Sequence, residues 1–200
     1  MKMKMFRVTV ILAVLGCLMI GGSLSRALAQ EDHTHMNTSQ GDDQSEQKNQ
    51  ASALIKVVRE STDRFQNVAA AQAAGYFLQF GCVSGPDFGA MGMHFVNMSL
   101  VTDGILDATR PEILIYEPLP NGRLRLIGAD YLLLADAWNA THSAPPQLMG
   151  QLFHLFESPN RFGLPAFYTL HVWAWKDSPT GAFVNWHANV SCNAFSGQTP

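Results

Sequence analysis

The sequence contains one β-hairpin whose two arms and turn can all be read from residue types, and it constrains the fold more than any other feature. Residues 112–117 are rich in β-branched and aromatic side chains, which favour strands. Asn121-Gly122 is a strong signal for a tight turn, and residues 123–132 supply the returning strand, in which Gly128 is a candidate for a β-bulge. Strands joined by so short a turn pair antiparallel, so we expect an antiparallel sheet at the centre of the fold.

A second hairpin is predicted near the end of the chain. Residues 166–176 form an aromatic-rich strand, residues 177–181 a turn, and residues 182–192 the returning strand. Because side chains alternate between the two faces of a strand, Thr169 and His171 should lie on the same face of the first arm.

One long helix is predicted before the sheet. Apolar residues recur on a single helical stripe through residues 52–74, and Gly75 is well placed to end that helix. Residues 147–156, which follow two prolines, are predicted to form a further short helix. These elements predict an α+β fold, in which one N-terminal amphipathic helix packs on a mainly antiparallel sheet that curls into a half-barrel.

Residues 1–29 have the pattern of a secretory signal peptide. Three basic residues precede an apolar run that ends at Ile20, and small residues permit cleavage after Ala29. The run is shorter than the ~20 residues that span a bilayer, so an uncleaved anchor ranks lower, and we expect no stable membrane insertion after the signal is removed. Lipidation at Cys17 is a third alternative, although the apolar run continues beyond it. The pattern predicts a periplasmic or secreted protein.

The segment that follows the signal is strongly polar. Residues 30–50 contain a single large apolar residue, Met36, and such a segment cannot bury enough surface to offset the entropy of ordering. We therefore predict a disordered tether over residues 30–50 and a single folded domain over residues 51–200.

Charge and motif content exclude several classes of function. Four of the 13 basic residues and none of the 16 acidic residues lie before residue 30, so the chain after residue 29 has a formal net charge of −7. An acidic chain without a basic cluster is a poor partner for nucleic acid or for an anionic membrane. The sequence also lacks the motifs of serine hydrolases, zinc proteases, phosphate-binding loops and Cys-x-x-Cys redox sites.

Two cysteines, Cys82 and Cys192, remain after removal of the signal peptide. An even number of cysteines in an oxidising compartment predicts a disulfide, which here would tie the beginning of the folded domain to its end. Two buried free thiols are the alternative.

A small set of histidines and carboxylates is the best candidate for a functional site. The stretch from Gly89 to Asn97 is punctuated by glycines and delivers a single histidine, His94, into an apolar run. Predicted strands also carry Glu117, Asp130 and His171. Two imidazoles with one or two carboxylates on rigid strands suit one divalent transition metal, namely Fe, Zn, Mn or Cu.

Each of these residues also has a structural interpretation. A strand histidine among tryptophans is often a hydrogen-bonded core residue, Glu117 sits beside a turn, and Asp130 could pair with a nearby arginine. The many aromatic side chains could line a pocket for a small-molecule ligand, but aromatic residues more commonly fill an ordinary core.

Several stretches together resemble a family of exported bacterial proteins that has no assigned activity. They are Phe65-Gln66-Asn67-Val68-Ala69-Ala70-Ala71-Gln72-Ala73-Ala74-Gly75-Tyr76, Met91-Gly92-Met93-His94-Phe95-Val96-Asn97, Pro111-Glu112-Ile113-Leu114-Ile115-Tyr116-Glu117-Pro118, Leu170-His171-Val172-Trp173-Ala174-Trp175 and Val190-Ser191-Cys192. The resemblance covers residues 60–192 and implies export and a single domain, but no mechanism.

The chain departs from the pattern of that family in two places. The family would have Trp-Asn-Pro where this chain has Trp186-His187-Ala188, which counts against a functional role for His187. It would have Glu-Tyr where this chain has Asp130-Tyr131, so a carboxylate is retained there.

Three functions are compatible with these features. The first is an exported protein that binds a small ligand or a metal. The second is a metal-dependent enzyme with an open site of two histidines and a carboxylate. The third is a structural or interaction module of the cell envelope, whose histidines would lie in separate pockets.

Overall fold

The computed structural model describes residues 35–197, with side chains from residue 42 onward. The predicted signal peptide at residues 1–29, its cleavage after Ala29 and the alternative at Cys17 lie outside the described residues and stay predictions. Within the described part of the chain, no helix is both long enough and apolar enough to cross a membrane.

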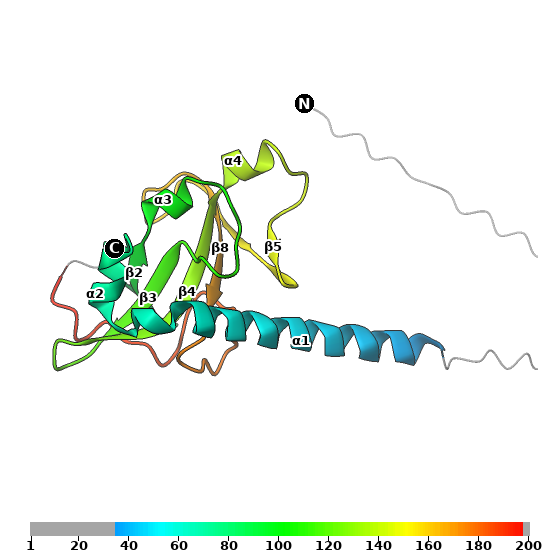
Figure 1. Cartoon of the computed structure of the whole chain (residues 1–200), viewed down its shortest axis with the longest axis horizontal. Helices are drawn as coiled ribbons and strands as arrows, with labels where there is room; N and C mark the ends of the chain where they lie inside the picture. The colour runs from blue at the N-terminus through cyan, green and yellow to red at the C-terminus, as the bar shows by residue number, and fades with distance from the viewer. Residues whose placement is uncertain (1–34, 198–200) are drawn as a thin grey trace, which may run out of the picture.

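The centre of the domain is one antiparallel sheet of six strands, in the order β1-β2-β3-β4-β8-β7. The sheet curls into a half-barrel, and helices lie along its sides (Figure 1), which confirms the predicted α+β class. The strands are β1 (Phe77–Gly85), β2 (Gly89–Val96), β3 (Ile113–Pro118), β4 (Leu124–Leu134), β7 (His154–Phe156) and β8 (Phe167–Val172).

The first predicted hairpin is confirmed as β3 and β4, including its bulge. Ile115 lies opposite Gly128 but Tyr116 lies opposite Leu126, so Ile127 is an extra residue in β4. A side chain on Gly128 would approach the Val172 carbonyl oxygen to 2.5 Å, which explains why a glycine stands at this bulge.

The predicted helix over residues 52–74 is present in three pieces: α1 (His35–Thr62), the 3-10 turn η1 (Asp63–Gln66) and α2 (Val68–Ala73). Asn67 has extended backbone angles that interrupt the helix, and its side chain accepts a hydrogen bond from the Ala69 amide to begin α2. Gly75 has a φ of 93° and follows the last helical residues, as expected for a residue that ends a helix.

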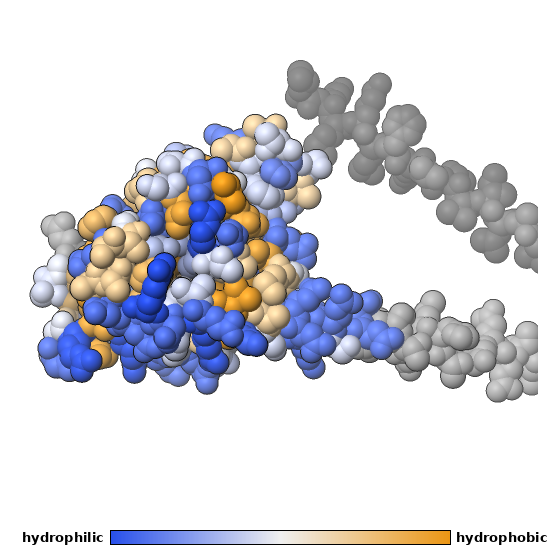
Figure 2. Space-filling model, viewed as in Figure 1, coloured by the Kyte–Doolittle hydropathy of each residue, from blue (hydrophilic) through white to orange (hydrophobic). Residues whose placement is uncertain are grey.

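Residues 35–50 of the predicted disordered tether are helical, because α1 begins at His35, and residues 30–34 lie outside the described residues. The first half of α1 extends beyond the rest of the domain (Figure 1), and its residues 42–49 are exposed and hydrophilic (Figure 2). This exposed part gains no stability from burial. It is helical because glutamine, glutamate and lysine are good helix formers and because the packed half of α1 provides the costly nucleus.

The two faces of the sheet are covered by different parts of the chain. Leu54 and Val58 of α1 lie fully buried in a cluster with Tyr131, Leu170 and Val172. The opposite face is covered by loops instead, so α1 leaves that face free for a site.

The interpretation of residues 147–156 as a helix is wrong. They form β5 (Gln147–Leu148), β6 (Gln151–Leu152) and β7, because Met149 and Gly150 both have positive φ angles and turn the chain back on itself. Leu152 of β6 is 62 % exposed.

The second predicted hairpin is only half right. Its first arm is β8, but β8 ends at Val172, and residues 182–192 form no strand of the sheet. The Trp173 amide still donates to the Ala182 carbonyl, after which the returning chain crosses to β2 and pairs with it only at Ala90 and His187. Two short helices complete the described fold, α3 (Met98–Val101) and α4 (Ala135–Asn139).

The predicted disulfide between Cys82 and Cys192 is confirmed. Cys82 is fully buried in β1, where it lies opposite Met93 of β2, so the bond fastens the end of the domain to the edge of the sheet.

Removing this bond should lower the stability of the domain substantially. The double variant Cys82→Ala, Cys192→Ala is expected to reduce the free energy of unfolding by about 4–5 kcal/mol, because a closed loop of this length restricts the unfolded chain strongly. Urea unfolding of the variant, beside the parent with and without reductant, measures the effect. A loss below about 1 kcal/mol would show that the bond does not restrain the unfolded chain.

Candidate metal centre

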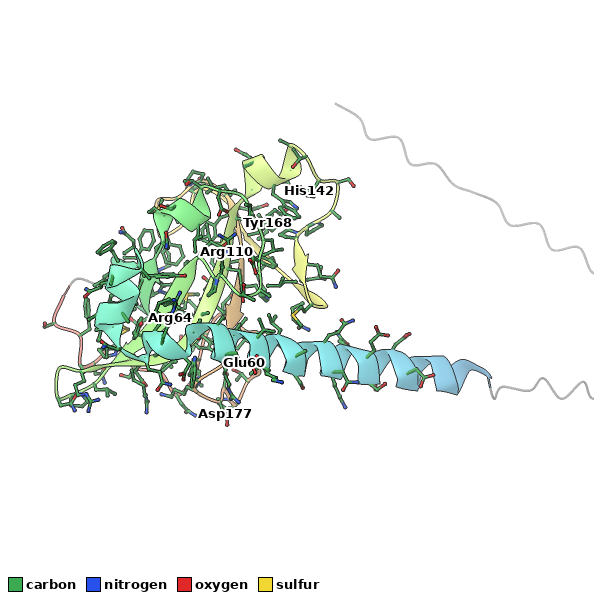
Figure 3. All side chains as sticks on the ribbon, viewed as in Figure 1. Glu60, Arg64, Arg110, His142, Tyr168 and Asp177 are labelled. Atoms are coloured by element: carbon green, nitrogen blue, oxygen red, sulfur yellow. A yellow bond between two sulfur atoms is a disulfide. The ribbon has the colours of Figure 1, made fainter. Side chains whose placement is uncertain are left out.

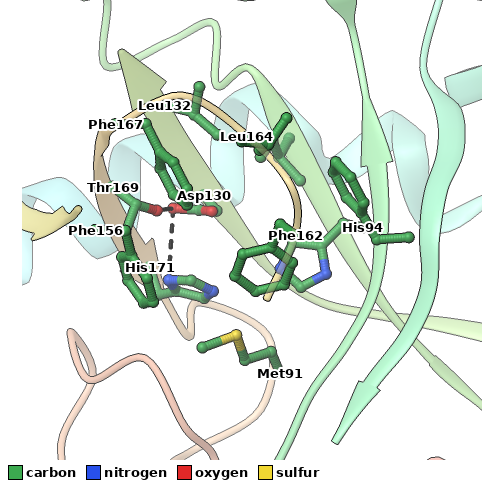
Figure 4. A pocket seen from close by; sticks show the side chains of 12 residues that line it. Met91, His94, Asp130, Leu132, Phe156, Phe162, Leu164, Phe167, Thr169 and His171 are labelled. Carbon is green, nitrogen blue, oxygen red and sulfur yellow. Dashed lines mark hydrogen bonds and ion pairs between the residues drawn. The ribbon is translucent and has the colours of Figure 1, made fainter. Parts of the chain in front are cut away.

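Three of the four predicted site residues come together on the face of the sheet opposite α1. His94 lies on β2, Asp130 on β4 and His171 on β8, and all three side chains are buried. One ligand atom from each lies within 4.8 Å of the other two, so this group could hold a metal ion (Figure 4).

The register of the strands explains this convergence. Asp130 lies directly opposite His171 on one side and opposite Ile113 on the other. Ile113 lies opposite Val96, which is two residues from His94 on β2. Residues that are directly opposite, or two apart in one strand, share a face, so all these side chains point to the same side. The curl of the sheet then brings His94 across β3 toward the other two.

The backbone near Gly92 orients the first imidazole. Gly92 has a φ of 87°, and a side chain there would approach the Tyr116 carbonyl oxygen to 2.8 Å, so only glycine fits. The Nδ1 atom of His94 lies 3.3 Å from the Gly92 carbonyl oxygen. In the tautomer that donates from Nδ1 to this carbonyl, Nε2 keeps a lone pair for a ligand, an arrangement that is usual for metal-binding histidines.

The second imidazole and the carboxylate sit at a separation that suits two ligands of one ion. The Nδ1 atom of His171 is 3.5 Å from Oδ1 of Asp130, and neither nitrogen of His171 has a hydrogen-bond partner among the described residues. Two ligands at ~2.0–2.2 Å from a tetrahedral ion lie roughly 3.3–3.6 Å apart. Oδ1 of Asp130 is fixed by the Thr169 hydroxyl, which donates to it at 2.5 Å.

Burial sets the protonation of the three groups. Burial, together with the nearby His171, lowers the pKa of His94 to about 4. Burial lowers the pKa of His171 to about 3, and the nearby Asn185 side chain offsets this only in part. Burial raises the pKa of Asp130 to about 6, against the opposing effect of His94. At neutral pH the group therefore consists of two uncharged imidazoles and one ionised carboxylate, the form that binds a metal.

Unsatisfied polar atoms also gather here. Both nitrogens of His171 are buried and unsatisfied in the described part of the chain, and His171 belongs to the group that could hold an ion. A buried polar atom without a partner costs roughly 1–3 kcal/mol, so an ion on these groups would remove part of that cost.

The three residues line a small cavity of about 30 Å³. A water molecule needs roughly 10–15 Å³ of such space, so there is room for an ion and little more. Four phenylalanines, which we call the aromatic cover, line the cavity: Phe80, Phe156, Phe162 and Phe167. Phe162 is at their centre, with ring centroids 5.7–6.2 Å from the other three rings.

Glu117 was wrongly placed in this site. Its carboxylate accepts hydrogen bonds from Lys176, at 2.8 Å, and from Arg125. Burial acts to raise the pKa of Glu117, but Lys176 and Arg125 outweigh it and hold this pKa below its ordinary value. The residue faces the same side of the sheet as Ile113 but lies four residues further along β3, or roughly 13 Å at the ~3.3 Å rise of a strand.

The other histidines have separate surroundings. His142 is exposed beside α4 (Figure 3), where its ring stacks on Trp138 at 3.7 Å. His187 is buried and packs edge-on against Trp173. His154 lies opposite Thr169 on the face of the site but is exposed.

Sequence reasoning missed two neighbours of the site. Strand alternation placed Thr169 beside His171, but only the structure shows that its hydroxyl holds Asp130. Met91 also lines the cavity, and Gly92, which breaks the alternation beside it, was the available signal.

Comparisons of this chain with protein-family models, with curated proteins and with solved structures found no match. The resemblance to an exported bacterial family therefore stays a prediction, and the geometry of the site carries the functional argument.

A second buried carboxyl lies near the site but differs from Asp130 in charge. Oε2 of Glu112 accepts a hydrogen bond from the Leu132 amide at 3.1 Å, whereas Oε1 is buried without a partner among the described residues. Burial, with a smaller contribution from Asp130, raises the pKa of Glu112 to about 8. At neutral pH Glu112 is therefore protonated and adds no charge beside the site.

This protonation should make the stability depend on pH. The pKa of Glu112 is higher in the folded state, about 8, than its ordinary value of 4.5, so its stabilising contribution is complete below pH 4.5 and is lost as the pH rises toward 8. In that window the free energy of unfolding should fall by about 1.4 kcal/mol per pH unit through this group. Glu112→Gln is an uncharged isostere and should remove the pH dependence that Glu112 contributes to the free energy of unfolding. Urea unfolding of the variant and the parent at several pH values measures the difference. Parallel pH profiles would contradict the assignment.

Proposed function

We propose that this chain is an exported protein whose folded domain binds one transition-metal ion through His94, Asp130 and His171. The observation that carries the proposal is the convergence of these three buried side chains, from three different strands, within 4.8 Å of one another. Imidazole nitrogen with carboxylate oxygen suits Zn, Fe, Mn or Cu.

Support for export comes from the chemistry of the compartment. The bond between Cys82 and Cys192 persists in oxidising surroundings such as the periplasm or the extracellular space. It agrees with the signal peptide predicted for residues 1–29, so we propose a periplasmic or secreted location.

A metal-dependent enzyme is the second candidate, and one observation favours it. Three protein ligands leave a coordination position on a four-coordinate ion, which is the arrangement of catalytic rather than structural zinc sites. The cavity of about 30 Å³ beside the group would admit water or a comparably small ligand in this conformation. A larger organic ligand would require the aromatic cover to move.

Metal analysis of the protein exported to the periplasm tests the proposal directly. We expect one metal ion per chain in the parent protein, and a loss of affinity of about a hundredfold or more in His94→Ala, Asp130→Asn and His171→Ala. His142→Ala is the matched control, because it removes an exposed histidine outside the site and should leave metal uptake unchanged.

Thermal unfolding provides an independent measurement. A ligand that binds only the folded state stabilises it by about 2.7 kcal/mol at a free concentration a hundred times its Kd. Chelation should therefore lower the Tm of the parent and leave the Tm of the three site variants unchanged. The proposal is contradicted if the parent carries no stoichiometric metal and its Tm changes with neither added ions nor chelators. The domain would then be interpreted as a structural or interaction module.

A further inference from the structure

We propose that the thioether of Met91 is the fourth ligand of this centre and that the ion it takes is copper, in particular monovalent copper. The inference rests on the proposed metal-binding function and names the metal that the site prefers. A fourth protein ligand leaves no open position on a four-coordinate ion, so it counts against the metal-dependent enzyme.

The position of Met91 results from an irregularity in β2. Gly92 lies opposite Val83 of β1, but Ala90 lies opposite Ser84, so Met91 is an extra residue in β2. Regular alternation would place Met91 and His94 on opposite faces, because they are three residues apart. The bulge, together with the positive φ of Gly92, turns Met91 onto the face of His94 instead.

Met91 reaches the same cavity as the three other groups. Its side chain is 1 % exposed and lines the cavity with His94, Asp130 and His171. Figure 4 draws Met91 on the side of the cavity away from Leu132, and its side chain and the His171 ring line the same cavity. Met93, which keeps the regular alternation, lies instead in the core cluster with Cys82 and Phe95.

The combination of donors favours copper over the other candidates. Thioether sulfur is a soft ligand that selects monovalent copper, and imidazole is an accepted copper ligand. Mn favours carboxylate and water oxygens, and zinc is bound by thiolate, imidazole and carboxylate rather than by thioether. Two imidazoles and one thioether therefore distinguish copper from zinc, although the carboxylate alone does not.

The charge of the cavity favours the monovalent state. Its lining contains a single carboxyl, that of Asp130, and no lysine or arginine. A monovalent ion on one carboxylate and three neutral donors leaves no net charge, whereas a divalent ion leaves one positive charge below the phenyl rings of the aromatic cover. Burying an uncompensated charge in apolar surroundings is costly.

Competition titrations on the full exported chain test the proposal. The probes are Cu(I), titrated anaerobically against a coloured Cu(I) chelator, and Zn(II), titrated against a zinc chelator. Met91→Leu keeps the volume of the side chain and removes the sulfur, and it should lower the Cu(I) affinity at least tenfold while changing the Zn(II) affinity less than threefold. Met93→Leu is the matched control on the same strand and should leave both affinities within threefold of the parent.

The outcomes separate this inference from the proposed function. Equal Cu(I) affinity in Met91→Leu and the parent, with binding lost in His94→Ala, overturns the role of Met91 and leaves the metal site standing. Failure of the parent to bind either ion overturns both. If Met91→Leu does not fold, X-ray absorption of the Cu(I)-loaded parent decides: a copper–sulfur scattering path supports the inference, and a spectrum with only nitrogen and oxygen neighbours overturns it.

Discussion

The pairing of β4 with β8 is the constraint on which the rest of the structure depends. It sets Asp130 directly opposite His171 in the interior of a sheet that is covered on both faces. A carboxylate in that position has lost its water and has no lysine or arginine in the cavity to replace it. Its compensation must come from hydrogen bonds, which Thr169 provides in part, or from a cation. Burying the Asp130 carboxylate in the sheet therefore costs folding free energy unless a hydrogen bond or a cation compensates its charge.

The two faces of the sheet differ in what they bury. One face packs against α1 through aliphatic and aromatic side chains and has an ordinary core. The other face gathers the polar groups under the aromatic cover, which keeps water out and keeps the local dielectric low. Because the packing of α1 and the site are on opposite faces, the site can hold unsatisfied atoms without interrupting the main core.

Strand alternation made much of this predictable from the sequence. Residue type on predicted strands named His94, Asp130 and His171, whose side chains the structure brings together, and the turn at Asn121-Gly122 fixed the antiparallel pairing. Alternation predicts the face of the sheet on which a side chain lies but not its position along the strand. Glu117 lies on the face of the site, but too far along β3 to reach the other three residues. Strand pairing extended from the turn at Asn121-Gly122 sets Glu117 opposite Arg125. The ion pair between these two residues was therefore predictable from the sequence.

The remaining errors arose where backbone conformation overrides periodicity. The bulge at Met91 reverses the face of a side chain, and no count of residue spacing reveals this. The positive φ angles of Met149 and Gly150 convert a helix-like pattern into a hairpin. The second arm leaves β8 after the Ala182 carbonyl accepts from the Trp173 amide, and at His187 it pairs with Ala90 of β2, a long-range contact that local sequence does not encode.

The aromatic cover has a kinetic consequence. The rings of Phe80, Phe156, Phe162 and Phe167 contact one another over the cavity, and the segment that carries Phe162 is a loop rather than a strand. An ion held there, as proposed, would have to leave past these rings, and loop opening takes microseconds to seconds in proteins rather than the nanoseconds of free diffusion. The residence time of such an ion would therefore depend on the loop as well as on the strength of its ligands.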